Sequence, residues 1–418
     1  MTAVSRVSSP VVYAKAALIL ISFALFATEN YVHYPVALMS LLGLAQIAWR
    51  PRGCLTGQAR TLLIVFGLIW IPMLIASFDA VNFQRSAETT ARYLHFLPAA
   101  YFVFSACRHA DVLRLVTAGT AVLVIFAGFD AFAQLIWHVN LFGYPYDGEI
   151  LKGVFHPKQR LGLFLAVFAP LYVDAVIRWC RSLPRTWFLL LPIIIVILMS
   201  LKRTAWIMLF VGMAGYLLLH LRINRQRIRD LPILPIAIVL AVAVTTVLFN
   251  PTLKQRLQSS AGVFSTDAVE VEEATANRLS LWRTGTSMLA DNWIAGIGPR
   301  SFRYAYAAYA DEDDFWLQRN GVGQTHPHLF FLEVAIETGL LGIVGLIGVT
   351  FLLGREMLRA PSRIGLPVWL LCALVAWFPL NAHMAFYGSY WSTLAWLLIP
   401  LGLAEVRTKP VEEHAGDG

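Results

Sequence analysis

Two histidines stand where a long polar segment meets an apolar one. Thr325-His326-Pro327-His328 runs directly into LFFLEVAIETGLLGIVGLIGVTFLLG, residues 329–354. An imidazole exchanges protons near pH 7 and can serve as a general base. If residues 329–354 form a membrane helix, the positive helix end keeps the imidazole of His328 neutral. His328 is therefore a candidate base, or else a solvated residue at a helix start, and His326 is an orienting partner or only a neighbour.

Basic residues in two short segments offer a second kind of chemistry. Lys202 and Arg203 stand in the tight turn of ILMSLKRTAW, and Lys158 and Arg160 stand in GVFHPKQRLG. Under the topology that the charges predict, both segments face the side that usually lacks Lys and Arg. Arginine suits a phosphate or pyrophosphate, because it offers a planar fork of donors and a permanent charge. The alternative is that each side chain reaches for lipid headgroups. Three other basic residues share this placement: Arg85, Arg92 and Lys152.

Carboxylates also occur inside apolar segments. Placing a charge in lipid costs so much free energy that each such residue is expected to have a role. Glu337 lies nine residues beyond His328, about half a turn out of phase on a helix, so hydrogen bonding suits it better than proton transfer. Glu333 shares that segment, and Asp130 has no partner evident in the sequence. The run Asp311-Glu312-Asp313-Asp314 is either a solvated charge run or a set of oxygen ligands for a divalent cation. No His/Cys spacing resembles a zinc site, and we expect neither a metal nor a cofactor.

The elements that must position these residues are membrane helices. The chain of 418 residues is 58% hydrophobic and 14% charged, with a mean hydropathy of +0.64. Apolar runs of about 17–25 residues recur along it, each long enough to cross a bilayer. Backbone groups in lipid must bond within their own segment, so the predicted fold is an all-α polytopic membrane protein. The first run, from Val11, lacks a small-residue cleavage site and is expected to be a retained helix.

About twelve spans are predicted, with both termini on one side. Residues 1–249 hold spans one to nine, 250–328 form a long exported loop, 329–404 hold spans ten to twelve, and 405–418 form a cytoplasmic tail. Gly339, Gly342 and Gly345 are spaced for close packing of the tenth span. The spans are placed at 11–28, 32–49, 61–78, 93–106, 113–136, 160–177, 186–201, 204–220, 231–249, 329–353, 364–380 and 388–404.

Basic residues in alternate short loops predict the orientation. Under the positive-inside rule these loops face the cytoplasm, and the segment 250–328 faces the opposite side. The net charge of +8 is then a topology signal, and no nucleic-acid partner is needed. Because Cys54, Cys107 and Cys180 fall on the cytoplasmic side and Cys372 lies in a span, no disulfide is expected in the exported segment. The basic residues are Arg50, Arg52, Arg60, Arg108, Arg178, Arg181, Arg185, Arg222, Arg225, Arg227, Arg229, Arg355, Arg359 and Arg363.

The exported segment has helical patterning of its own. Residues 276–290 (ANRLSLWRTGTSMLA) place Leu279, Trp282, Thr286 and Leu289 on one helical stripe, which could lie in the headgroup region with Trp282 pointing down. GIGP at 296–299 then breaks the helix. The aromatic residues that follow predict a small helical cap on the bundle, and one or two of them could stack on a sugar ring. They are Phe302, Tyr304, Tyr306, Tyr309, Phe315 and Trp316.

Taken in order, these residues resemble the O-antigen ligases and their relatives, the O-antigen polymerases and bacterial protein O-oligosaccharyltransferases. The family motif is a His, an Asn, Ser or Gln, nine residues and then Gly. His328 and Gly339 stand at that spacing, while Leu329 replaces the amide or hydroxyl residue. Lys202-Arg203-Thr204 resembles the family's Ser-Arg-Gly-like turn. Arg278 in NRLSLW, followed by NWIAGIG, resembles the loop leading to its G-x-G, and GVFHPKQRLG resembles its G-x-F-x-x-x-N segment.

The resemblance implies a membrane glycosyltransferase of the C-type architecture. Such an enzyme would move a polysaccharide from undecaprenyl pyrophosphate to lipid A–core, at the periplasmic face of the bacterial inner membrane. The reaction would be inverting and independent of metal, with membrane lipids as the only other partners. His328 would be the base. The pyrophosphate would be bound by Arg203 and Arg278, with Lys202, Lys158, Arg160 and His326 assisting.

Two other functions stay open on the sequence. An O-antigen polymerase would use the same donor and differ only in its acceptor. A transporter or flippase of lipid-linked sugars would also have about twelve spans, but transporters tend to show repeated halves and polar residues at mid-membrane. Here the charges gather at the outer face and one loop is oversized, which favours transfer chemistry.

Overall fold

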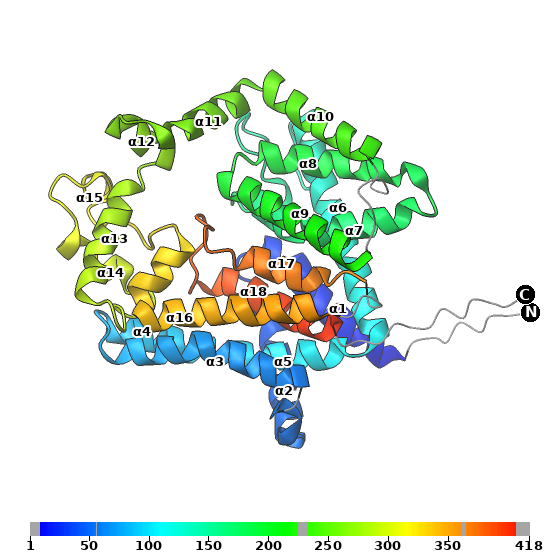
Figure 1. The fold of residues 1–418 in the computed structure, drawn as a ribbon, viewed down its shortest axis with the longest axis horizontal. Helices are drawn as coiled ribbons and strands as arrows, with labels where there is room; N and C mark the ends of the chain where they lie inside the picture. The colour runs from blue at the N-terminus through cyan, green and yellow to red at the C-terminus, as the bar shows by residue number, and fades with distance from the viewer. Residues whose placement is uncertain (1–8, 56, 225–232, 361–364, 407–418) are drawn as a thin grey trace, which may run out of the picture.

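The computed structural model describes residues 9–55, 57–224, 233–360 and 365–406, and within these ranges all regular structure is helical (Figure 1). Each of the twelve predicted spans overlaps a helix. These helices are α1 (Pro10–Ala24), α2 (His33–Trp49), α3 (Gly57–Phe78), α5 (Phe96–Cys107), α6 (Ala110–Trp137), α7 (Leu161–Cys180), α8 (Leu190–Met199), α9 (Arg203–Asn224), α10 (Ile233–Phe249), α16 (Phe330–Arg359), α17 (Val368–Ala376) and α18 (Ser389–Glu405). The remaining helices are α4 (Phe83–Tyr93), α11 (Pro251–Ala261), α12 (Ala268–Thr275), α13 (Leu279–Asp291), α14 (Phe302–Tyr309) and α15 (Phe315–Asn320).

Six helices in the described ranges are long and apolar enough to cross a membrane. The chain is therefore an all-α, multi-pass membrane protein, as its composition indicates, while the count of twelve spans stays a prediction. The six segments are Pro10–Ala27, Gly57–Phe78, Ala110–Trp137, Leu161–Cys180, Arg203–Arg222 and Phe330–Arg359.

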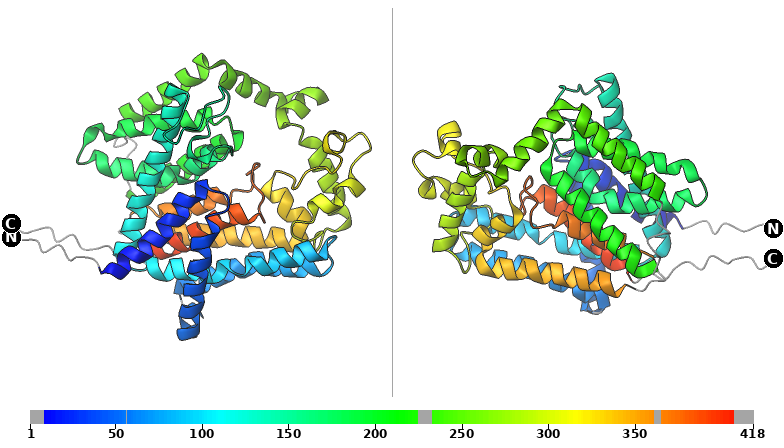
Figure 2. Two further views of the ribbon diagram at one scale, coloured as in Figure 1. Left: turned by 180° about the vertical axis from the view of Figure 1, so that it is seen from behind. Right: turned by 45° about the horizontal axis from the view of Figure 1, so that its top comes forward.

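The core of the bundle surrounds α7. In the most apolar 18-residue stretch of α7, 83% of the residues are buried, whereas in the other five candidate spans this share is 33–50%. A helix that is hydrophobic on all sides needs neighbours on all sides, and α7 has α6, α8, α9 and α17 around it. Figure 2 shows α17 and α18 running through the middle of the molecule as well. Trp369 of α17 and Trp396 of α18 are fully buried there.

Loops that were predicted to face the same side do meet at one end of the bundle. Glu29, after α1, lies 3.1 Å from Lys158 Nζ and 3.0 Å from Arg160 Nη2, both of which precede α7. Lys202, in the turn before α9, donates a hydrogen bond to Gln159. Three of the predicted outer loops are thereby connected through charged and polar side chains.

The remaining outer loops join the same end. The amide of Val81, before α4, donates to the carbonyl of Ile297 in the exported segment at 3.0 Å. The amide of Phe330, at the start of α16, donates to the carbonyl of Asn381 at 3.0 Å. Figure 1 shows α13, α14 and α15 gathered beside α4 and the first turns of α16. The segment between α10 and α16 is therefore docked on the loops of the bundle, while its export stays a prediction.

The cap has a small core of its own, but its buried face differs from the predicted stripe. Leu281, Thr284, Gly285 and Met288 are the buried residues of α13, whereas Thr286 is exposed. They pack against α14 and the first part of α16. Trp282 and Leu289 of the predicted stripe are partly buried and pack against this core, while the predicted place of the stripe in the headgroup region stays a prediction.

Gly339 interrupts the helical conformation of α16. Its backbone is left-handed, with φ 61° and ψ −155°, and a Cβ there would lie 2.3 Å from the carbonyl oxygen of Ile294. A side chain would be strained in this conformation, so the prediction that Gly339 serves close helix packing is corrected. Gly345 does serve that purpose, because a Cβ would lie 2.0 Å from the Leu68 carbonyl oxygen of α3.

Some sequence predictions concern residues outside the described ranges. They are the basic residues Arg225, Arg227, Arg229 and Arg363 and the tail from residue 407 onward.

Candidate functional site

The two histidines of the THPH segment form a pair just before α16. Their ring centroids lie 4.0 Å apart, with the planes tilted by 49°. His326 is buried, and its Nδ1 lies 2.9 Å from the Thr325 hydroxyl, while its Nε2 has no hydrogen-bond partner in the described part of the chain. Pro327 between them accepts a hydrogen bond from the indole of Trp282 at 3.1 Å. This bond fixes the turn that sets the two rings side by side.

His328 has a backbone conformation that is unusual for a side-chain-bearing residue. Its φ is 53°, in the left-handed region, which costs free energy and persists only where the surroundings impose it. His328 stands one residue before the cap of α16, close to the predicted position at the first turn. Its Nδ1 is buried without a hydrogen-bond partner among the described residues. The ring thus has proton-accepting capacity that the fold does not use.

Leu329 occupies the cap position of α16 and makes no side-chain cap. The first helical amides are bonded from elsewhere: Phe330 donates to the Asn381 carbonyl at 3.0 Å, and Phe331 donates to the Pro379 carbonyl at 3.1 Å. The side chain of Leu329 packs against the apolar core of the cap. An amide at this position is therefore not needed to satisfy the start of the helix.

Positive charge surrounds the histidine pair. Burial, together with the charges of Arg278 and Lys202, lowers the pKa of His328 to about 4. Burial and the neighbouring imidazole of His328 also hold the pKa of His326 well below its ordinary value. Both rings are therefore neutral at pH 7, which is the state that a general base needs.

Lys202 and Arg278, whose charges act on His328, are themselves partly buried. Burial and the charges of Arg256, Arg278 and Lys152 lower the pKa of Lys202 to about 8. Burial and the charges of Arg203 and Arg256 lower the pKa of Arg278 to about 10. Cations held together against their repulsion form a preorganised environment for an anion. The structure thus brings His328, Lys202 and Arg278 together.

Arg203 lies near this group, but its guanidinium is directed at the exported segment. It donates to the carbonyl of Ala274 and, at 2.9 Å, to the hydroxyl of Ser259. Its Nε is buried and has no hydrogen-bond partner in the described ranges. Arg203 therefore ties α9 to the segment around α11 and α12 through two of its donors.

Lys158 and Arg160, in the segment before α7, share one acidic partner. Both form ion pairs with Glu29, at 3.1 and 3.0 Å, and the Arg160 guanidinium lies 3.9 Å from the ring centroid of Tyr390. Although burial opposes it, hydrogen bonding to Arg160 and Lys158 lowers the pKa of Glu29. One carboxylate is thus shared by two cations, which leaves a net positive charge on this group.

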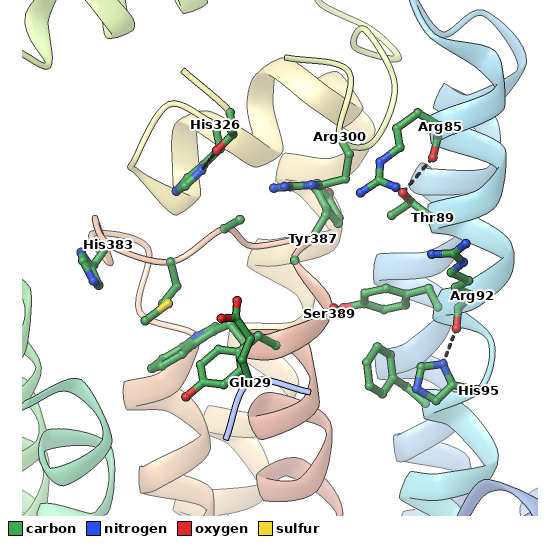
Figure 3. A pocket seen from close by; sticks show the side chains of 18 of the residues that line it. Glu29, Arg85, Thr89, Arg92, His95, Arg300, His326, His383, Tyr387 and Ser389 are labelled. Carbon is green, nitrogen blue, oxygen red and sulfur yellow. Dashed lines mark hydrogen bonds between the residues drawn. The ribbon is translucent and has the colours of Figure 1, made fainter. Parts of the chain in front are cut away.

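A cavity of about 410 Å³ opens between α4, the His326 turn and the loop before α18 (Figure 3). Ligand pockets for small molecules usually have a volume of about 300–1,000 Å³. His326, Arg160 and Glu29 line it, whereas His328, Lys202, Arg203 and Arg278 do not. The other lining residues are Arg85, Thr89, Arg92, Tyr93, His95, Phe96, Arg300, Thr325, His383, Met384, Ala385, Tyr387, Gly388, Ser389, Tyr390 and Trp391.

The sequence profile of the O-antigen ligase family matches residues 188–347. This match covers 160 of the 418 residues. The matched stretch runs from the start of the α8 region into α16, so it includes the histidine pair and the cations Lys202, Arg203 and Arg278. A comparison with the curated proteins found no match. The match supports, in general terms, an enzyme that acts on lipid-linked polysaccharide in a membrane.

The sequence analysis did not single out several residues of the site. Arg300 has φ 63°, and its amide donates to a Glu337 carboxylate oxygen at 2.6 Å. Its guanidinium lies 4.0 Å from Glu333, which also accepts hydrogen bonds from the amides of Phe386 and Tyr387. The hydrogen-bonding role predicted for Glu337 is thus present. An Arg directly after the GIGP break was the signal available for Arg300.

His383 is a third imidazole near the pair, in the loop between α17 and α18. Burial and the charge of Lys202 lower its pKa to about 3, with His328 and Arg278 also contributing. His383 lies between predicted spans eleven and twelve and therefore in a predicted outer loop. This position was the sequence feature from which its place in the site could have been inferred. The loop that carries it also supplies the carbonyls that start α16.

Other predicted acidic features have structural roles. Asp130 does have partners, since its carboxylate accepts hydrogen bonds from the Asn140 side chain and the Leu141 amide, both at 3.0 Å. Asp314 caps α15, and it accepts a hydrogen bond from Tyr306 at 3.0 Å. Within the described ranges, no group of three His, Cys, Asp or Glu side chains is arranged to hold a metal ion.

Proposed function

We propose that this protein is an O-antigen ligase, which transfers a polysaccharide from undecaprenyl pyrophosphate to lipid A–core at the periplasmic face of the bacterial inner membrane. The observation that carries the proposal is the neutral imidazole of His328 beside Arg278 and Lys202, at the end of the bundle where the outer loops meet. The family match over residues 188–347 supports the reaction class. Orientation toward the periplasm and cytoplasmic termini follow from the distribution of basic loops.

The proposed reaction is a single displacement. The uncharged imidazole of His328 takes the proton of an acceptor sugar hydroxyl as its oxygen attacks the anomeric carbon of the donor. The bond from that carbon to the pyrophosphate oxygen breaks, and the electron pair leaves with the pyrophosphate. One displacement inverts the anomeric configuration. The proton on His328 then passes to solvent or to the released pyrophosphate.

The departing pyrophosphate requires fixed positive charge. Lys202 and Arg278 are the first candidates, because their charges act directly on His328. Arg203 joins them as a weaker candidate, since two of its donors already bind Ala274 and Ser259. Lys158 and Arg160 assist from the Glu29 side. Such preorganised charge commonly supplies about 3–4 kcal/mol per donor in a site that excludes water, and the proposed mechanism needs no metal.

A deletion strain tests the proposal. Loss of long surface chains, with free lipid-linked polymer accumulating, would support a ligase. A single repeat still attached to the core would instead indicate an O-antigen polymerase. Purified protein should transfer polymer in the presence of a chelator, and a requirement for an added divalent ion would overturn the metal-independent mechanism. Loss of surface polysaccharide with the lipid-linked sugars retained on the cytoplasmic side would instead indicate a flippase, and unchanged surface polysaccharide would reject the proposal.

A further inference from the structure

The cavity beside His326 has a cationic wall that the proposed mechanism does not use. Arg300 has a side chain only 12% exposed, and its Nη1 is buried with no hydrogen-bond partner in the described part of the chain. The nearest carboxylate, that of Glu333, is 4.0 Å away. An arginine held in this way has donors available for a ligand, and unsatisfied buried donors are costly unless something binds them.

Arg85 of α4 completes this wall. Figure 3 shows the Arg300 guanidinium between His326 and the Arg85 guanidinium, with both arginines directed into the cavity. Among the described residues, no carboxylate lies within 4.0 Å of Arg85, whereas Arg92 pairs with Glu88 at 3.4 Å. Two guanidinium groups with little counter-charge thus face the same space, a geometry that favours a phosphate or a carboxylate.

The rest of the lining suits a sugar. Tyr390, Trp391 and Tyr93 line the cavity together with the hydroxyl groups of Thr89 and Ser389. Aromatic faces stack on the apolar faces of sugar rings, and hydroxyls exchange hydrogen bonds with sugar hydroxyls. Glu29 is the only carboxylate among the described lining residues, and it is paired with Lys158 and Arg160.

Lys202 and Arg278, the first candidates for the pyrophosphate, lie outside this cavity, whereas Arg160, which lines it, is paired with Glu29. His328 is likewise not among the residues that line the cavity, whereas Arg85, Arg300 and His326 line it. A transferase needs its base between the leaving group and the incoming hydroxyl. With the pyrophosphate on the Lys202 and Arg278 side, the acceptor belongs on the Arg300 side.

We propose that this cavity binds the acceptor glycolipid through an anionic group on its sugar headgroup, with Arg85 and Arg300 as the ligands of that anion. The inference rests on the proposed function, because that function supplies the distinction between donor and acceptor. It adds a substrate class: the acceptor carries a phosphate or a carboxylate close to the sugar that is extended. A membrane phospholipid headgroup presents the same chemistry and is the rival source.

Binding to the full chain in nanodiscs tests this assignment without requiring turnover. The probe is the water-soluble oligosaccharide released from lipid A–core, offered with its phosphates intact and after phosphatase treatment. Arg85→Gln removes the charge at a partly buried residue that has no ion pair, and Arg300→Lys keeps the charge while losing the guanidinium fork. The matched control is Arg283→Gln, an exposed arginine of the exported segment paired with Asp311 at 3.6 Å.

Wild type and the Arg283→Gln control should bind the phosphorylated probe about tenfold more tightly than the dephosphorylated one, and Arg85→Gln should lose that preference. Equal affinity of wild type for both probes overturns the proposal. So does displacement of the probe by phosphatidylglycerol at equal concentration, which would assign the cavity to a membrane lipid.

Turnover provides a second readout. In transfer assays, Arg85→Gln and Arg300→Lys should raise the KM for the acceptor about tenfold and leave the KM for the donor unchanged. A rise in the donor KM alone would assign the cavity to the donor and overturn the inference while leaving the glycosyltransferase function intact. A wild-type protein that binds the probe with the expected preference but transfers nothing would reject the proposed function instead.

Discussion

The rings of His326 and His328 lie 4.0 Å apart, yet they face different surroundings. His326 lines the cavity and is engaged with the Thr325 hydroxyl, whereas His328 lies beside Arg278 and Lys202. Burial keeps both rings uncharged at neutral pH. The pair therefore has one member at each of the two proposed substrate sites, with His328 next to the charges assigned to the leaving group.

This division predicts unequal effects of substitution. His328→Ala should lower the rate of polysaccharide transfer by at least about 100-fold, because a positioned base contributes about 10²–10⁴-fold. His326→Ala should lower it by about tenfold, since it removes a neighbour that orients the base and the acceptor. The measurement is transfer to lipid A–core by purified variants of equal abundance. A normal rate for His328→Ala would reject the assignment of the base.

The pH dependence of transfer should have two limbs with known causes. A base must be neutral, so kcat/KM should fall as the pH drops toward about 4, the pKa of His328. Lys202 must be charged to hold the pyrophosphate, so kcat/KM should also fall as the pH rises through about 8. Arg278→Gln removes a charge that lowers both pKa values, and both limbs should therefore move to higher pH. An acid limb that stays in place in this variant would contradict the proposed proximity of Arg278 and His328.

Replacing Leu329 by an amide residue, as in the motif that the sequence resembles, should not increase the rate of transfer. Leu329→Asn should leave the transfer rate within about twofold of wild type, because carbonyls of Pro379 and Asn381 already bond the first amides of α16. It should also reduce stability by about 1 kcal/mol, since an amide replaces an apolar contact with the core of the cap. Thermal unfolding and transfer assays on the same preparation measure both effects. A large gain in rate would show that the amide orients His328 directly.

The sequence predicted the helices well because each span carries its own hydrophobic signal. It also placed His328, Lys202 and Arg278 on one side, since topology alone assigns loops to sides. It did not predict Arg300 or His383 as members of the site, because the packing of the exported segment and of the α17–α18 loop brings them there. The buried residues of α13 were not singled out either, because contacts with α14 and α16 determine which side of that helix is buried.

Arg203 and Arg278 should respond differently to substitution, although the family resemblance assigned them one role. Arg203→Gln should lower stability by about 1–3 kcal/mol, because it frees the Ala274 carbonyl and the Ser259 hydroxyl. Arg278→Gln should leave stability nearly unchanged and lower transfer by about 100-fold through lost charge stabilisation. The control is Ser259→Ala, which should reproduce part of the stability loss with normal transfer. Equal melting temperatures for the two arginine variants would contradict the structural role of Arg203.

Gly339 supplies the sharpest test of the fold around the site. Gly339→Ala should destabilise the protein by more than about 2 kcal/mol, because the residue has φ 61° and an added Cβ would lie 2.3 Å from the Ile294 carbonyl oxygen. Gly354→Ala in the same helix is the matched control. A Cβ there meets nothing within 4 Å, so this variant should be neutral or slightly stabilising. Melting temperatures in detergent compare the two, and a pair of equal values would show that α16 is not broken at Gly339.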